Sequence, residues 1–174
     1  MNVYECIRGM RAARRFADRP LPEKVLGHIL EAGRWAGSAK NRQPWHFIVV
    51  RDRGMLDRLA TCGQYASHLR EAGVAVVIVT GSARYDDLDA GRCGQNMMLA
   101  AWADGIGSCI ASLHNEAKAC AALGVPAGMK IQMAISFGYP APGADDKIEG
   151  LPKAQVLASL GRKPLGDLVH HDRW

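Results

Sequence analysis

The sequence has 174 residues, of which 48% are hydrophobic and 22% are charged, as expected for one globular domain with a core of its own. No apolar run approaches the roughly 18 residues of a membrane-spanning helix, and no basic segment followed by an apolar one opens the chain, so we expect neither a membrane partner nor a signal peptide. The net charge of +5 is uneven, because residues 1–58 carry +6 and the remainder −1. This basic third lacks interleaved aromatics and any zinc-finger or RNA-recognition motif, so we expect no nucleic-acid partner.

The cysteines indicate a reducing environment. They are odd in number, widely spaced and without a C-x-x-C pair, which argues against a disulfide framework. We therefore expect free thiols and a cytoplasmic location for a protein whose five cysteines are Cys6, Cys62, Cys93, Cys109 and Cys120. No linker, repeat or low-complexity tract divides the chain, so we expect a single domain over residues 1–174.

Hydrophobic spacing predicts the elements of the N-terminal half. Apolar residues three and four apart predict helices over 2–10, about 22–36, 53–62 and 66–72. Residues 47–51 are expected to form a strand. The run 74–79 is continuously apolar and β-branched, which predicts a central strand buried on both faces.

In the C-terminal half a long helix is expected over 86–104. Its latter part, residues 97–103, is apolar all round and must be enclosed by the protein's own core or by a second subunit. A short strand over 109–111, a helix over 115–123 closed by Gly124 and a strand of period two over 131–137 follow. Residues 140–163 are rich in Pro, Gly and charge, with one helical turn expected near 155–160.

The C-terminal tail, about residues 164–174, is too apolar for free coil and has no local partner in the sequence. We therefore expect it to pack on another subunit. Its His170-His171-Asp172 run does not predict a metal site, because adjacent side chains in an extended segment point apart and no Cys or His lies at ligand spacing.

The loop Ser38-Ala39-Lys40-Asn41-Arg42-Gln43-Pro44-Trp45 is the most informative segment. Small residues let backbone N–H groups approach a ligand closely, and the carboxamides of Asn41 and Gln43 offer a donor and an acceptor together, which suits a heteroaromatic edge. Pro44 predicts an extended conformation for Arg42 and Gln43.

Three further segments carry chemistry. Arg11-Ala12-Ala13-Arg14-Arg15-Phe16 places three guanidiniums in five residues, which can clamp a phosphate or simply form a solvated basic face. A second basic pair, Arg162-Lys163, lies near the other end of the chain. The segment 105–113, G-I-G-S-C-I-A-S-L, is typical of a helix stop followed by a strand.

Together these segments resemble the FMN-dependent nitroreductase family, in particular its short members without a lid. Residues 36–45 are similar to the family's A-P-S-x-x-N-x-Q-P-W motif, 105–113 to G-x-G-S-C-W-I-G, and 11–16 to the end of R-R-S-x-R-x-F. Two of these motifs show departures that bear on the cofactor: Met10 and Ala12 stand where the family often has Arg and Ser, and Gly37 replaces a Pro. With Met10 in place of the first Arg, one charge-assisted contact is lost, usually worth about 1.5–3 kcal/mol, which would weaken flavin binding.

The resemblance implies an α+β fold, with a mixed, mainly antiparallel sheet flanked by helices, in an intertwined homodimer. It implies two FMN sites at the dimer interface, to which both subunits contribute. The basic residues would hold the phosphate, the loop would lie along the ring or ribityl chain, and a backbone N–H after the Gly-Ser-Cys segment would face flavin N5. The implied cofactor-binding residues are Arg11, Ala12, Arg14, Ser38, Ala39, Asn41, Gln43, Ser112, Leu113, Arg162 and Lys163.

The resemblance also implies a ping-pong reaction, in which NAD(P)H gives a hydride to flavin N5 and an electron-poor substrate, such as a nitroaromatic or a quinone, then receives it. No side chain stands out as an obligatory acid, base or nucleophile, and none is assigned as catalytic. The link over residues 81–87 is too short for a lid helix, which predicts an open site with broad acceptance and weak substrate affinity.

Two alternatives stay open. One is another flavin reaction known in the family, such as amide-bond dehydrogenation or reductive dehalogenation. The other is a non-catalytic FMN-binding module that uses its basic third to contact another macromolecule.

Overall fold

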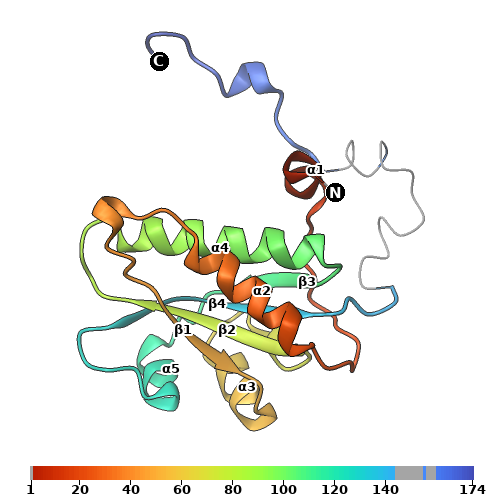
Figure 1. Ribbon diagram of the computed structural model, residues 1–174, viewed down its shortest axis with the longest axis vertical. Helices are drawn as coiled ribbons and strands as arrows, with labels where there is room; N and C mark the ends of the chain where they lie inside the picture. The colour runs from red at the N-terminus through yellow and green to blue at the C-terminus, as the bar shows by residue number, and fades with distance from the viewer. Residues whose placement is uncertain (1, 144–154, 156–159) are drawn as a thin grey trace. The chain divides into compact units, whose positions relative to one another are not determined.

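The computed structural model describes residues 2–143, 155 and 160–174. Residues Met1–Ala144 form one compact unit and Asp145–Trp174 a second. The first unit is a sheet with helices on both faces (Figure 1). Its elements are α1 (Val3–Gly9), α2 (Glu23–Arg34), the 3₁₀ turn η1 (Ala39–Asn41), β1 (His46–Val50), α3 (Arg53–Ala60), the 3₁₀ turn η2 (Ser67–Leu69), β2 (Val74–Thr80), α4 (Asp86–Ala103), β3 (Gly107–Ala111), α5 (Glu116–Leu123) and β4 (Lys130–Gly138).

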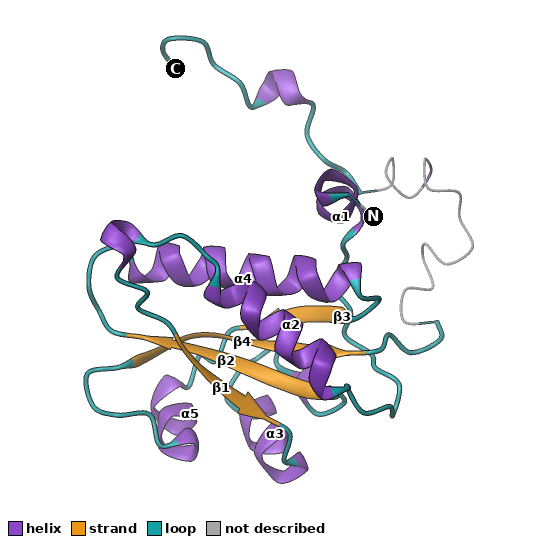
Figure 2. Cartoon of the chain, in the orientation of Figure 1, coloured by secondary structure: helices purple, strands orange, loops and turns teal. Residues whose placement is uncertain are grey.

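The sheet has the strand order β1-β2-β4-β3, and each neighbouring pair is antiparallel. An isolated parallel bridge joins Ala12 to Ser108 of β3, so the sheet is mixed at that edge. Helices α2 and α4 cover one face, and α3 and α5 cover the other (Figure 2). The predicted α+β fold, with a mainly antiparallel sheet flanked by helices, is therefore confirmed.

The central strand β2 is buried at every position, as its uninterrupted apolar run predicts. Val76 and Ile78 pack into the core under α2 and α4, whereas Val77 and Val79 pack into the core over α3 and α5. Alternate residues of one strand thus serve two cores, one on each side of the sheet. Strand β4 resembles β2 in this respect. Its apolar residues alternate with polar and small ones as predicted, but residues 134–138 are buried at every position because helices cover both faces of the sheet.

One predicted helix is shorter than expected. Residues 66–72 form only the 3₁₀ turn η2, with hydrogen bonds between residues three apart. The side chain of His68 in this turn is drawn toward the sheet, where its Nδ1 lies 2.8 Å from the Ser136 hydroxyl oxygen of β4. This tertiary contact, with Gly73 immediately after the segment, replaces the helix that local spacing predicts.

In its C-terminal half, helix α4 is covered by the rest of the chain on one side and is open on the other. Met97, Met98 and Ala101 are buried, whereas Leu99 is half-buried and Ala103 exposed. An apolar groove of about 440 Å³ runs between α1, α2 and the C-terminal half of α4. Its lining includes two exposed hydrophobic side chains, Val3 (71% exposed) and Trp35 (72% exposed).

The second unit is described only over Gln155 and residues 160–174. It contains the 3₁₀ turn η3 (Leu165–Asp167), and the rings of His170 and Trp174 stack with their centroids 4.2 Å apart. Its apolar side chains are exposed, including Trp174 at 99%. The helical turn predicted near 155–160 lies outside the described residues apart from its two ends. Among the helices of the described residues, none is long and apolar enough to cross a membrane.

Candidate functional site

The basic N-terminal motif lies along the outer edge of β3. Ala12 forms a parallel bridge with Ser108, and the Ala13 N–H donates to the Ser108 carbonyl at 2.9 Å. Phe16 bridges Pro140 at the end of β4 and is buried. The fold therefore brings together two segments that sequence spacing leaves apart, the basic motif and the Gly-Ser-Cys segment.

Gly107 makes this close approach possible. A Cβ at this position would lie 2.5 Å from the Ala13 Cβ and 3.0 Å from Pro140 Cγ. We expect Gly107→Ala to lower the free energy of unfolding by about 1–3 kcal/mol, because the basic motif must move away from β3. Denaturant unfolding measures this change. At Gly27 on α2 a Cβ meets nothing within 4 Å, so Gly27→Ala is the matched control and should leave stability unchanged or raise it by up to ~1 kcal/mol.

The guanidiniums of the motif differ in their surroundings. Arg11 Nη1 donates to the carbonyls of Arg8 (2.8 Å) and Met10 (2.7 Å), and so covers the C-terminal end of α1, while its buried Nε has no partner within the described part of the chain. Arg14 is exposed, and its charge opposes the rise that burial produces in the pKa of the Cys109 thiol. Arg15 points elsewhere, with Nη1 3.4 Å from the Gly143 carbonyl.

The carboxamide loop has an unusual backbone. Lys40, Asn41 and Gln43 all have left-handed φ angles, of 53°, 54° and 49°. The extended conformation expected for Gln43 before Pro44 is therefore wrong. The reason is local: the Gln43 N–H turns back to the Ser38 hydroxyl oxygen at 2.9 Å, which closes the loop on itself.

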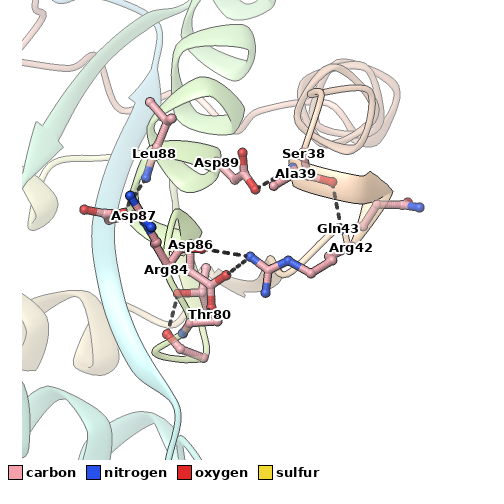
Figure 3. Close-up of polar contacts among 12 residues, drawn as sticks. Ser38, Ala39, Arg42, Gln43, Thr80, Arg84, Asp86, Asp87, Leu88 and Asp89 are labelled. Carbon is pink, nitrogen blue, oxygen red and sulfur yellow. Dashed lines mark hydrogen bonds and ion pairs between the residues drawn. The ribbon is translucent and has the colours of Figure 1, made fainter.

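Two buried carboxylates at the start of α4 anchor this loop (Figure 3). Asp89 Oδ2 accepts from the Ala39 N–H at 3.1 Å, and Asp86 Oδ1 accepts from Arg42 Nη2 at 2.7 Å. Both aspartates are only 2% exposed. Sequence reasoning missed them, although three acidic residues in the first turn of a long helix are a visible signal, since the helix dipole favours them there.

Loop and basic motif lie at opposite ends of α4. The anchors Asp86 and Asp89 stand in its first turn, whereas a Cβ at Gly9, just before the basic motif, would lie 3.2 Å from the side chain of Trp102 near its end. An 18-residue helix is about 27 Å long. Within one chain the two groups of predicted flavin-binding residues therefore do not meet.

The remaining predicted site residues fall in two places. Ser112 and Leu113 directly follow β3, the first exposed and the second buried, and the Ser112 carbonyl packs so tightly on Gly63 that a Cβ there would approach it to 2.2 Å. They come directly after the strand that forms the bridge to the basic motif. Arg162 and Lys163 belong to the second unit and are exposed.

Burial disfavours the charged forms of two thiols and one imidazole in the core. Burial raises the pKa of the Cys93 thiol to about 12 and raises that of Cys109, so neither is a thiolate near neutral pH. Burial, with the nearby Arg14 charge, lowers the pKa of His68. All five cysteines are free, as predicted. In the described part of the chain no three His, Cys, Asp or Glu side chains form a group that could hold a metal ion.

Comparison with known proteins identifies the family to which this fold and these segments belong. The model of the nitroreductase family matches residues 7–67 and 60–139. A Methanothermobacter thermautotrophicus protein, provisionally named NADH dehydrogenase/NAD(P)H nitroreductase, is 32% identical over 157 residues, covering 84% of this chain and 82% of that protein. The chain belongs to the nitroreductase family and is an oxidoreductase of that type, as the motifs predict.

Solved structures agree with this assignment. A provisionally named NADH dehydrogenase/NAD(P)H nitroreductase from Parabacteroides distasonis superposes with a TM-score of 0.85 at 26% identity, over 100% of both chains. A provisionally named nitroreductase from Desulfovibrio desulfuricans, crystallised in complex with FMN, has a TM-score of 0.79 at 29% identity, covering 100% of this chain and 98% of that one.

Proposed function

We propose that the protein is an FMN-dependent oxidoreductase that uses NAD(P)H to reduce electron-poor aromatic substrates, such as nitroaromatics and quinones. The observation that carries the proposal is the pairing of two unlike half-sites on one scaffold. One is a row of guanidiniums held against β3, and the other is a loop of preorganised carboxamides at the far end of α4. The first suits a phosphate and the second a heteroaromatic edge.

The residues present fit FMN. At the phosphate end, Arg14 is exposed and Arg11 keeps a buried Nε that has no partner among the described residues, so charge-assisted donors remain available. In the loop, the Ala39 N–H and the Ser38 oxygen are already engaged within the chain, by Asp89 and by the Gln43 N–H. The open polar groups for a flavin ring are accordingly the exposed carboxamides of Asn41 and Gln43.

We assign roles to the predicted residues on this basis. Arg11, Ala12 and Arg14 would hold the phosphate. For Arg162 and Lys163 of the second unit the same role rests on the family resemblance alone. The ring and ribityl chain would contact Ser38, Ala39, Asn41 and Gln43, and the backbone N–H of Ser112 or Leu113 would be the donor to flavin N5.

A homodimer makes such a site complete. Because the two half-sites lie near opposite ends of α4, a helix about 27 Å long, we infer that one flavin contacts both only when they come from different copies of the chain. The apolar groove beside α1 and α2 and the half-exposed apolar residues of α4 supply a surface for this pairing.

Bound FMN supplies the hydride chemistry, and the chain supplies position and charge. The guanidiniums favour an anionic cofactor by their positive potential. Burial raises the pKa of the Cys93 and Cys109 thiols, which disfavours the nucleophilic thiolate at both positions. Only Gly81–Tyr85 separate β2 from α4, and no helix covers the loop from this link, which supports an open site with broad acceptance and weak substrate affinity.

Colour and redox titration test the proposal. The purified protein is expected to be yellow and to release FMN on heating. NADH or NADPH added without oxygen should bleach the flavin, and a panel of nitroaromatics, quinones, halogenated aromatics and amides should show which class restores the colour. Apoprotein that takes up no FMN would refute the function. Flavin that binds but is not bleached would leave a non-catalytic FMN module.

Removing residues 164–174 is expected to give a monomeric or unstable protein, because the apolar tail loses its packing against the partner. Light scattering after size-exclusion chromatography, with a thermal melt, measures both effects. The variant with Asp167→Ser and Arg173→Ser keeps the apolar tail residues and should stay dimeric. A stable dimer after truncation would contradict the predicted role of the tail.

A further inference from the structure

The backbone of the carboxamide loop is strained, so contacts with the rest of the chain must maintain its conformation. Three residues with side chains, Lys40, Asn41 and Gln43, adopt left-handed φ angles within four positions. Such angles are unfavourable for residues other than glycine, although asparagine tolerates them better than most. They persist where surrounding contacts over-determine them. The nature of these contacts therefore decides whether the loop keeps its form before any ligand arrives.

The contacts come from two buried carboxylates on one face of α4. Asp89 Oδ2 accepts from the Ala39 N–H at the start of the 3₁₀ turn, and Asp86 Oδ1 accepts from Arg42 Nη2 at its end. Figure 3 shows the two aspartates reaching from the helix toward opposite ends of the turn. The second oxygen of Asp86 also accepts from the Ala83 N–H at 3.0 Å, which fixes the aspartate itself.

The buried charges of Asp86 and Asp89 are compensated by neighbouring groups. Carboxylates are rarely this buried unless they are paired, and well-packed apolar residues would serve stability as well. Here the helix N-terminus and two arginines compensate the charges, Arg42 on Asp86 and Arg92, whose Nη1 lies 3.8 Å from Asp89 Oδ1. The aspartates are thus held ready as acceptors for the loop, while the carboxamides of Asn41 and Gln43 stay exposed on its outer side.

We propose that Asp89, supported by Asp86, is a positioning residue for the flavin-binding loop. It acts through the Ala39 N–H and keeps the loop in the single backbone arrangement that presents Asn41 and Gln43 to the cofactor. This inference rests on the proposed FMN function and extends it to residues that do not touch the cofactor.

The expected loss of FMN affinity follows from the fraction of molecules whose loop keeps its binding conformation. When the anchor is removed, the strained residues relax, and only a fraction of molecules keeps the binding-competent loop. The apparent dissociation constant rises by the inverse of this fraction. A loop that is competent in about one molecule in ten binds FMN about tenfold more weakly.

Three variants separate positioning from general stability. Asp89→Ala removes the acceptor, and we expect about tenfold weaker FMN binding, measured by fluorescence titration of the apoprotein, with a visible flavin band closer to that of free FMN. Asp89→Asn keeps an oxygen for the Ala39 N–H and should restore binding to within about threefold of wild type. Asp87→Ala is the matched control. Asp87 is an exposed acidic residue in the same helical turn, and its side chain accepts locally, from the N–H of the next residue, Leu88.

Hydrogen exchange of the Ala39 amide provides a readout that needs no cofactor. It should be slow in wild type and in Asp89→Asn, and fast in Asp89→Ala. Wild-type protein that binds no FMN would refute the proposed function, while the exchange result would still decide whether Asp89 anchors the loop. Unchanged exchange and affinity in Asp89→Ala would overturn the inference, as would equal losses in Asp89→Ala and Asp87→Ala.

Should Asp89→Ala fail to fold, Arg42→Ala tests the other anchor, because the Arg42 side chain is 37% exposed and carries little of the core. Severalfold weaker FMN binding is expected in this variant. Wild-type affinity and an unaltered flavin band would count against the inference.

Discussion

Replacing Arg14 with alanine is expected to weaken FMN binding by about ten- to hundredfold and to leave the fold intact. A hydrogen bond to a charged group contributes about 1.5–3 kcal/mol, and each 1.4 kcal/mol is a factor of ten in the dissociation constant. The side chain is exposed, so its removal opens no cavity in the core. Titrating the apoprotein with FMN and following the quenching of flavin fluorescence measures the dissociation constant.

Arg15→Ala is the matched control for this experiment. Neighbouring side chains of an extended segment point to opposite sides, and Arg15 reaches the Gly143 carbonyl rather than the surroundings of Cys109. We expect less than about a twofold change in affinity. If Arg14→Ala binds FMN as tightly as wild type does, the basic motif is a solvated face and the phosphate site lies elsewhere.

Replacing Leu88 with arginine is expected to weaken dimerisation and FMN binding together. Leu88 is 59% exposed on the first half of α4, so the monomer tolerates the change. We propose that the dimer interface extends along α4 to this exposed leucine. The new charge is then buried there without a partner, which costs at least about 2 kcal/mol, or roughly thirtyfold in the dimer dissociation constant. Sedimentation at several concentrations gives this constant, and the same samples are titrated with FMN.

Ala121→Arg places the same charge on an exposed position of α5, the helix layer on the opposite face of the sheet, and should alter neither property. The joint loss is the informative outcome, because it links the two half-sites to two copies of the chain. A Leu88→Arg monomer that retains full FMN affinity would show that one chain builds the whole site.

Much of the fold could be predicted, because its signals are local. The unbroken β-branched run of β2 predicts a strand covered on both faces, and Gly124, with a left-handed φ of 67°, ends α5 where expected. Predictions failed where a specific side-chain contact overrode the local preference of the backbone. The helix expected over 66–72 gave way to the long-range contact of His68 with Ser136. Arg42 and Gln43 are not extended as Pro44 predicts, because the Gln43 N–H closes the loop on the Ser38 hydroxyl.

The candidate site shows the same division. The residue types that suit a phosphate and a flavin edge can be recognised from the sequence, because the donors and acceptors are properties of the individual side chains. Asp86 and Asp89 were missed, because an acidic first turn by itself indicates only a favourable helix dipole. Their meaning as anchors depends on a loop more than forty residues away in sequence, to which they are hydrogen bonded.

The amino-acid sequence by itself determined the family, the order of the elements and the kinds of groups offered to a cofactor, since spacing and turn chemistry are properties of short segments. Only the tertiary structure decided that the basic motif lies beside β3, that the carboxamide loop is anchored at the other end of α4, and that the Ala39 N–H turns inward. These facts are distances between segments far apart in the chain, and packing, not local periodicity, sets such distances.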